Sequence, residues 1–149
     1  MKKTILTLVL ATITYIGWGQ TVQTKNLHEF ITRGFTTVNI YKIEHQIMED
    51  RSYKVWNMTY QNAEYQHISD KASITLFNED EVIQFATDIE FMITQGNNDV
   101  VTLRDNYSIK NSGNSIFIFD EDKKYTYVSK SKAKKLINDI KSHSYLMND

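Results

Sequence analysis

The chain has 149 residues, a formal net charge of −1 at pH 7, and neither cysteine nor proline. The absence of cysteine excludes disulfide bonds, a thiolate nucleophile and cysteine-ligated metal. The near-neutral charge does not call for a polyanionic partner, and the length fits one domain with its own hydrophobic core.

The first twenty residues, MKKTILTLVLATITYIGWGQ, have the pattern of a secretory signal peptide. Lys2 and Lys3 precede an apolar run over 5–16, and Gly17 and Gly19 supply small residues two positions apart. The run is shorter than the roughly 20 apolar residues that span a bilayer. We therefore expect a signal peptide over 1–19 and a single domain over 20–149. The domain would be exported, periplasmic or secreted, without a membrane anchor after cleavage.

The first element expected in the exported part is a short helix over 26–34. Asn26 is a candidate N-cap, Glu29 completes a capping box, and Gly34 is a stop signal. Strand signals follow, separated by polar turn clusters, over 38–47, 53–60, 65–68 and 72–77. In the second of these strands, Trp56 and Met58 share one face, which we assign to the core.

The strongest helix signal in the chain begins at Asn78. Asn78 is a candidate N-cap, and Glu81 completes a capping box three residues later. Apolar residues then recur at helical spacing and form one stripe: Val82, Phe85, Ala86, Ile89, Met92 and Ile93. Gly96 ends the pattern. We expect this stripe to pack against a sheet.

Strand signals return in the second half of the chain, and a final helix follows them. The expected strands cover 100–105, 107–110, 115–120 and 124–129. Ser129 is the candidate N-cap of the last helix, whose apolar stripe contains Ala133, Leu136, Ile137 and Ile140.

Strands grouped before each helix favour antiparallel hairpins over parallel crossovers. The sequence therefore predicts an α+β fold: a meandering antiparallel sheet with two main helices packed on one face and a short N-terminal helix. Segments 74–90 and 125–141 share an apolar skeleton and matching caps, which raises the alternative of two β-meander-plus-helix units. Two such units resemble the topology of PUR-type nucleic-acid-binding repeats. The chain has none of that family's sequence motifs, and topology alone assigns no function.

The start of the last helix is the first candidate site, for an anion or an acidic partner surface. It combines the N-cap with four cations: Ser129, Lys130, Lys132, Lys134 and Lys135. Cations at a helix N-terminus oppose the helix dipole by about 0.3–1 kcal/mol each. The same lysines, together with free backbone N–H groups, would suit a phosphate or sulfate. The alternative is a solvated helix face.

A second candidate site is aromatic. Tyr125 and Tyr127 lie two positions apart in a predicted strand, so both rings are expected on one face of the sheet. Tyrosines are favoured on recognition surfaces because they present a large rigid area with a polar tip. They are also ordinary cross-strand partners.

No catalytic residue, metal or cofactor is predicted. The four histidines, His28, His45, His67 and His143, lack metal-ligand spacing, and phosphate-binding and nucleophile motifs are absent. We expect a non-enzymatic binding module of the cell envelope, of adaptor or inhibitor type. Its partner would be another envelope protein or an anionic surface, and export disfavours nucleic acid. Two alternatives remain: a small hydrolase-like enzyme whose histidines and carboxylates converge only in the fold, and a nucleic-acid- or polyanion-binding domain.

Overall fold

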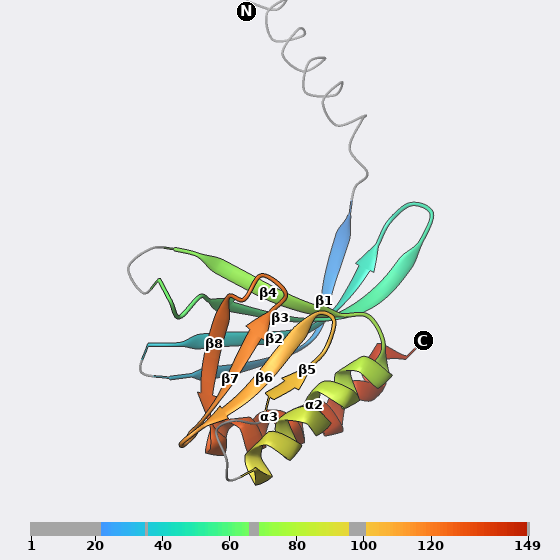
Figure 1. Ribbon diagram of the computed structural model, residues 1–149. Coiled ribbons are helices and arrows are strands. Elements are labelled where there is room, and N and C mark those ends of the chain that lie inside the picture. Colours follow the sequence, from blue (N-terminus) through green and yellow to red (C-terminus); the bar gives the residue numbers. More distant parts are fainter. Residues whose placement is uncertain (1–21, 35, 66–68, 96–100, 149) are drawn as a thin grey trace, which may run out of the picture.

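The protein is described by a computed structural model that covers residues 22–34, 36–65, 69–95 and 101–148. The predicted signal peptide and Gly96 lie outside these ranges. The described part contains two four-stranded antiparallel sheets and two α-helices (Figure 1), which confirms the α+β class. Within these ranges, no helix is long and apolar enough to cross a lipid bilayer.

Each sheet is a meander in which neighbouring strands follow one another along the chain. Sheet A has the order β1 (Gln23–Arg33), β2 (Val38–Ile47), β3 (Ser52–Gln61) and β4 (Lys71–Leu76). Sheet B has the order β5 (Val101–Leu103), β6 (Tyr107–Ser112), β7 (Ser115–Asp120) and β8 (Tyr125–Ser129). Helix α2 (Glu79–Thr94) follows sheet A. Helix α3 (Lys130–His143) follows sheet B and leads into a 3₁₀ turn, η1 (Ser144–Met147). The single sheet expected from the sequence is thus two sheets, each in a meander-plus-helix unit.

The short helix predicted over 26–34 was wrong, because this segment is strand β1. Phe30 lies opposite Tyr41 of β2, and Thr32 lies opposite Asn39. The free edge of β2 supplies backbone partners to this segment. Tertiary pairing of this kind overrides local helix signals. The short strand predicted over 65–68 falls mostly on residues outside the described ranges.

The hydrophobic core is shared by both sheets and both helices. The predicted α2 stripe supplies Val82, Phe85, Ala86, Ile89 and Met92, all fully buried, and the predicted α3 stripe is buried as well. The core face of sheet A contributes Trp56 and Met58, as expected. Helices α2 and α3 lie side by side (Figure 1), joined at the surface by an exposed Lys141–Glu90 ion pair of 2.8 Å. Such a pair contributes about 0–1 kcal/mol, so apolar packing holds the helices together.

Both predicted N-caps are confirmed. Asn78 Oδ1 accepts a hydrogen bond from the Glu81 N–H at 2.8 Å, and the Glu81 carboxylate accepts from the Phe77 N–H at 2.8 Å. Ser129 Oγ accepts from the Lys132 N–H at 3.3 Å. The reciprocal bonds at α2 satisfy two backbone donors, whereas the serine at α3 makes one longer bond.

Replacing Asn78 with alanine is expected to lower the free energy of unfolding by about 1 kcal/mol, because the Glu81 N–H loses its acceptor. Ser129→Ala is expected to cost less, since its bond is longer. Urea denaturation followed by tryptophan fluorescence measures both losses. Equal losses in the two variants would contradict the ranking of the caps.

Candidate functional site

The outer face of sheet B is the surface most clearly built for recognition. Paired residues of an antiparallel ladder point to the same side of the sheet. Two rows of them cross this face from β5 to β8: Leu103, Ser108, Phe119 and Tyr125 in one, and Val101, Lys110, Phe117 and Tyr127 in the other. We call these eight residues the outer face. The alternate residues, such as Ile109 and Ile118, are buried on the core side.

Large apolar side chains on this face are open to solvent. Leu103 is 70% exposed and Val101 is 43% exposed, and both belong to the short edge strand β5. Phe117, Phe119 and the predicted pair of tyrosines are partly exposed. Several exposed apolar side chains on one face of a small protein mark an interaction surface more often than isolated exposed residues do.

Four aromatic rings form a connected cluster on the outer face. Ring centroids lie 5.5 Å apart for Phe117 and Tyr127, 5.9 Å for Phe117 and Tyr125, and 5.4 Å for Phe119 and Tyr125. Tyr127 is held further by a 2.6 Å hydrogen bond between its hydroxyl and Thr36 Oγ1. The mutual contacts restrict the rings before any ligand arrives, which reduces the entropy lost on binding.

The outer face of sheet A differs in chemistry. Its central row contains Glu29, Lys42, Asn57 and Thr75. Lys42 pairs with Glu29 at 3.3 Å, and Thr75 donates a hydrogen bond to Asn57 at 3.5 Å. This row is therefore a polar surface whose groups already have partners. The neighbouring row, Ile31, Ile40, Thr59 and Ser73, is partly apolar but has no aromatic side chain. The aromatic cluster therefore favours sheet B as the recognition surface.

The free edge of sheet B at β8 is closed by sheet A. The Ala63 N–H donates to the Tyr125 carbonyl at 2.8 Å, and Thr37 Oγ1 donates to the Tyr127 carbonyl at 3.3 Å. Covering an edge in this way prevents another strand from adding to it. Binding at β8 must therefore use side chains of the outer face and not backbone pairing.

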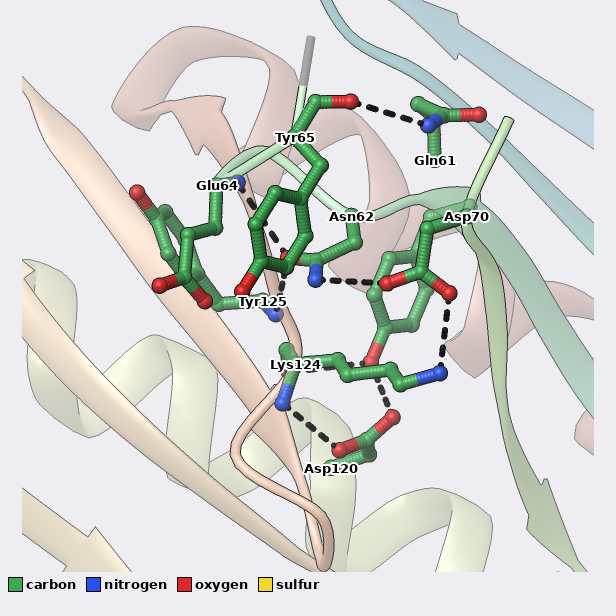
Figure 2. A network of polar contacts seen from close by, with 9 residues as sticks. Gln61, Asn62, Glu64, Tyr65, Asp70, Asp120, Lys124 and Tyr125 are labelled. Carbon is green, nitrogen blue, oxygen red and sulfur yellow. Dashed lines mark hydrogen bonds and ion pairs between the residues drawn. The ribbon is translucent and has the colours of Figure 1, made fainter. Parts of the chain in front are cut away.

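A polar network fixes the turn that covers β8, as Figure 2 shows. Tyr60 donates to Asp120 at 3.0 Å, and the Lys124 ammonium donates to Asp70 at 2.9 Å. Asn62 donates to the second Asp70 oxygen at 2.9 Å. The Asn62 bond and then the Lys124 bond lower the pKa of Asp70. Burial and then the bond to Asp120 raise the pKa of Tyr60. The network joins β3 of sheet A to β7 and β8 of sheet B.

A shallow hollow of about 220 Å³ lies on the outer face, lined by Lys110, Ser112, Phe117, Phe119 and Tyr125. Lys110 is exposed, and its ammonium forms no ion pair with any residue in the described ranges. The hollow thus combines aromatic walls with one available positive charge.

The predicted anion site at the start of α3 has fewer free backbone donors than the sequence suggested. Two of the backbone donors at the α3 N-terminus already have acceptors, since the Lys130 N–H donates to the Asn114 carbonyl at 2.9 Å and the Lys132 N–H donates to Ser129. Lys134 and Lys135 are exposed. Anion binding here remains a prediction.

One cavity brings together members of both predicted sites. It measures about 200 Å³ and is lined by Ser129, Lys132 and Tyr127, with Thr32, Gly34, Thr37, Ser115 and Val128. Tyr125 lies on the neighbouring hollow of the outer face. The predicted tyrosine pair therefore forms part of a larger surface that extends away from the helix.

A cavity of about 480 Å³ lies between α2 and the 104–107 turn. Two of its charged lining residues, Glu81 and Arg104, make structural contacts. Arg104 donates twice to the buried carboxylate of Asp88, at 2.7 and 2.8 Å, and Tyr107 donates at 2.9 Å. Burial would raise the pKa of Asp88, but the bonds from Arg104, Tyr107 and Gln84 outweigh it and lower that pKa. This arrangement stabilises the fold by joining α2 to the start of β6.

Comparison with known proteins adds no assignment. No family model and no curated protein matches the sequence. The function is therefore argued from the geometry alone.

Sequence reasoning identified Tyr125 and Tyr127 but missed the rest of the outer face. The alternation in SIFIFD places Phe117 and Phe119 on one side of β7, so the sequence carries a signal for them. Assigning Val101 and Leu103 to the same face requires the register of β5 against β6, which only the structure supplies.

Proposed function

We propose that the protein is a non-enzymatic binding module whose outer face docks onto another protein, in the cell envelope if the expected export takes place. The exposure of Leu103, on the same face of sheet B as the ordered aromatic cluster, carries the proposal. Aromatic side chains are enriched and charged side chains are depleted at the centres of protein interfaces. The outer face matches that composition, with Lys110 as its one charged residue.

A protein partner fits this surface better than a small molecule. Sites for small molecules are concave and usually enclose about 300–1,000 Å³. The hollow on the outer face encloses about 220 Å³ and is bordered by flat sheet. A broad, shallow apolar surface is complementary to a macromolecule.

The composition also disfavours single-stranded nucleic acid at this face. Such sites combine stacking rings with a positively charged groove that follows the phosphates. The outer face has the rings but only one cation, Lys110. A protein that offers apolar side chains and one carboxylate would complement both features.

The test is affinity capture from an envelope fraction, with the chain from residue 20 onward as bait. Leu103→Asp is expected to weaken capture at least about tenfold, because loss of one buried leucine contact costs about 1.5–3 kcal/mol. Lys110→Glu is expected to weaken it as well. Both side chains are exposed, so the bait should remain folded, which circular dichroism checks.

Matched controls carry the same changes elsewhere on the surface. Phe91 on α2 is 48% exposed, so Phe91→Asp adds the same charge to an apolar site outside the outer face. Lys71→Glu, at an exposed position on β4 outside both candidate sites, matches Lys110→Glu. Capture that resists both outer-face changes would refute the proposal. A partner lost when Lys130, Lys132, Lys134 and Lys135 are all changed to glutamate would instead support the predicted site at the α3 N-terminus.

A further inference from the structure

Two histidines and one aspartate from opposite ends of the chain converge where β1 packs on α3. His28 lies on β1 immediately after an irregularity in its pairing with β2, between Asn26 and His28. Asp139 and His143 are four residues apart on α3 and therefore share one face of the helix. All three side chains are partly exposed, at 22%, 15% and 36%, so the cluster is open to ions from solvent.

The potential ligand atoms already lie close together. His28 Nε2 is 2.9 and 3.0 Å from the two carboxylate oxygens of Asp139. His143 Nδ1 is 3.3 Å from Asp139 Oδ1. One atom from each residue can be chosen so that all three lie within 4.8 Å of one another. No other group of three or more such side chains meets this criterion within the described ranges.

These separations suit a small divalent ion with imidazole and carboxylate ligands. Zn²⁺ binds histidine nitrogen and carboxylate oxygen at about 2.0–2.2 Å, which places tetrahedral ligands roughly 3.3–3.5 Å apart. The His143–Asp139 distance of 3.3 Å matches that separation, and the His28–Asp139 distance of 2.9 Å is slightly shorter, so a small outward movement of His28 would admit the ion. Imidazole is a preferred ligand for zinc, and three protein ligands plus water is a known zinc coordination set.

We propose that His28, Asp139 and His143 bind one Zn²⁺ ion, with water completing its coordination. The site is independent of the outer face and adds a ligand that the proposed function does not include. It would join the first described strand to the last helix through the ion, in place of the hydrogen bonds that His28 Nε2 makes with Asp139.

Binding requires two defined local changes. The imidazole rings of His28 and His143 are stacked, with centroids 3.8 Å apart and planes 15° apart, so they must tilt toward a common point. His143 Nδ1 also lies 2.9 Å from the backbone carbonyl of Asp139. As a metal ligand this nitrogen carries no proton, so the proton moves to Nε2 and the contact to the carbonyl is given up.

The first measurement is isothermal titration calorimetry, with ZnCl₂ added to chelator-treated protein. The second is the thermal unfolding temperature with and without ZnCl₂. The protein from residue 20 onward is expected to bind one Zn²⁺ and to gain thermal stability from it. His28→Gln keeps a hydrogen-bond donor beside Asp139 but removes an imidazole ligand. This substitution is expected to lower the affinity for Zn²⁺ at least about 100-fold, because even the loss of an outer-shell partner lowers metal affinity 10–100-fold.

His45→Ala is the matched control, because it removes a histidine from β2 outside the cluster. It should bind Zn²⁺ as the unchanged protein does. Co²⁺ substitution provides a second readout, and a tetrahedral Co²⁺ spectrum lost in Asp139→Asn would support the ligand set. The proposal is overturned if His28→Gln binds Zn²⁺ as tightly as the unchanged protein. It is also overturned if Zn²⁺ raises the thermal stability of the variant as much as that of the unchanged protein. A purely structural role for His28 would lower stability equally with and without the ion.

Discussion

Replacing Phe85 with alanine is expected to lower the free energy of unfolding by about 3–5 kcal/mol. Phe85 is fully buried, and its ring centroid lies 5.0 Å from that of Trp56 in sheet A and 5.0 Å from that of Tyr107 in sheet B. The substitution leaves a cavity at the point where α2 contacts both sheets, and both aromatic contacts are lost. Urea denaturation followed by the fluorescence of Trp56, the one tryptophan after residue 19, measures the loss.

Phe91→Ala on the same helix is the control. Phe91 is 48% exposed, so its loss is expected to change the stability by no more than about 0.5 kcal/mol. The urea dependence should keep a single transition with an unchanged slope, because the shared core unfolds as one unit. A loss below about 1.5 kcal/mol for Phe85→Ala would contradict the central position given to this ring.

Replacing Asp88 with asparagine is expected to lower the free energy of unfolding by about 2–3 kcal/mol at pH 7. Removing one partner of a buried ion pair typically costs about 3–5 kcal/mol. The expected value is lower here because the Arg104 side chain is 43% exposed and water can replace part of the lost interaction. The Tyr107 hydroxyl also loses the charged carboxylate oxygen to which it donates its hydrogen bond.

The same substitution is expected to remove part of the pH dependence of stability. The pKa of Asp88 in the folded protein lies below its ordinary value of 3.8, because bonds from Arg104, Tyr107 and Gln84 outweigh burial. The ionised form therefore stabilises the fold above pH 3.8, and this contribution is lost as the pH falls through the folded-state pKa. The stability difference between the unchanged protein and Asp88→Asn should shrink between pH 6 and pH 2.5.

Asp105→Asn, at an exposed neighbour of Arg104, provides the control for a general change in charge. It should leave both the stability at pH 7 and its pH dependence nearly unchanged. A stability difference for Asp88→Asn that is the same at pH 6 and pH 2.5 would show that the charge of Asp88 does not act through its bonds in the folded state.

Most helices and strands could be predicted because their signals are local. The capping box at Asn78 and Glu81 and the stripe that follows depend only on neighbouring residues, and α2 begins at the predicted place. The segment 26–34 carried equally local helix signals. Its strand conformation depends on pairing with β2, which follows it in sequence. Capping signals alone do not reveal this pairing.

The candidate sites were harder to predict because they depend on register and on distant contacts. Tyr125 and Tyr127 share a face by simple alternation, but their contacts with Phe117 and Phe119 require the pairing of β7 with β8. His28 is separated from Asp139 by 111 positions, so no motif spacing reveals their contact. The absence of metal-ligand spacing among the histidines was therefore a poor guide to whether they converge.

The contact between β1 and α3 also determines when the protein can complete its fold during synthesis. His28 and its neighbours on β1 leave the ribosome well before Asp139 and His143, which are more than a hundred positions further along the chain. Sheet A can form its ladders as soon as its own strands have emerged, but the β1 surface that packs on α3 stays uncovered until α3 arrives. The unit that emerges first therefore cannot reach its final stability until α3 has been made.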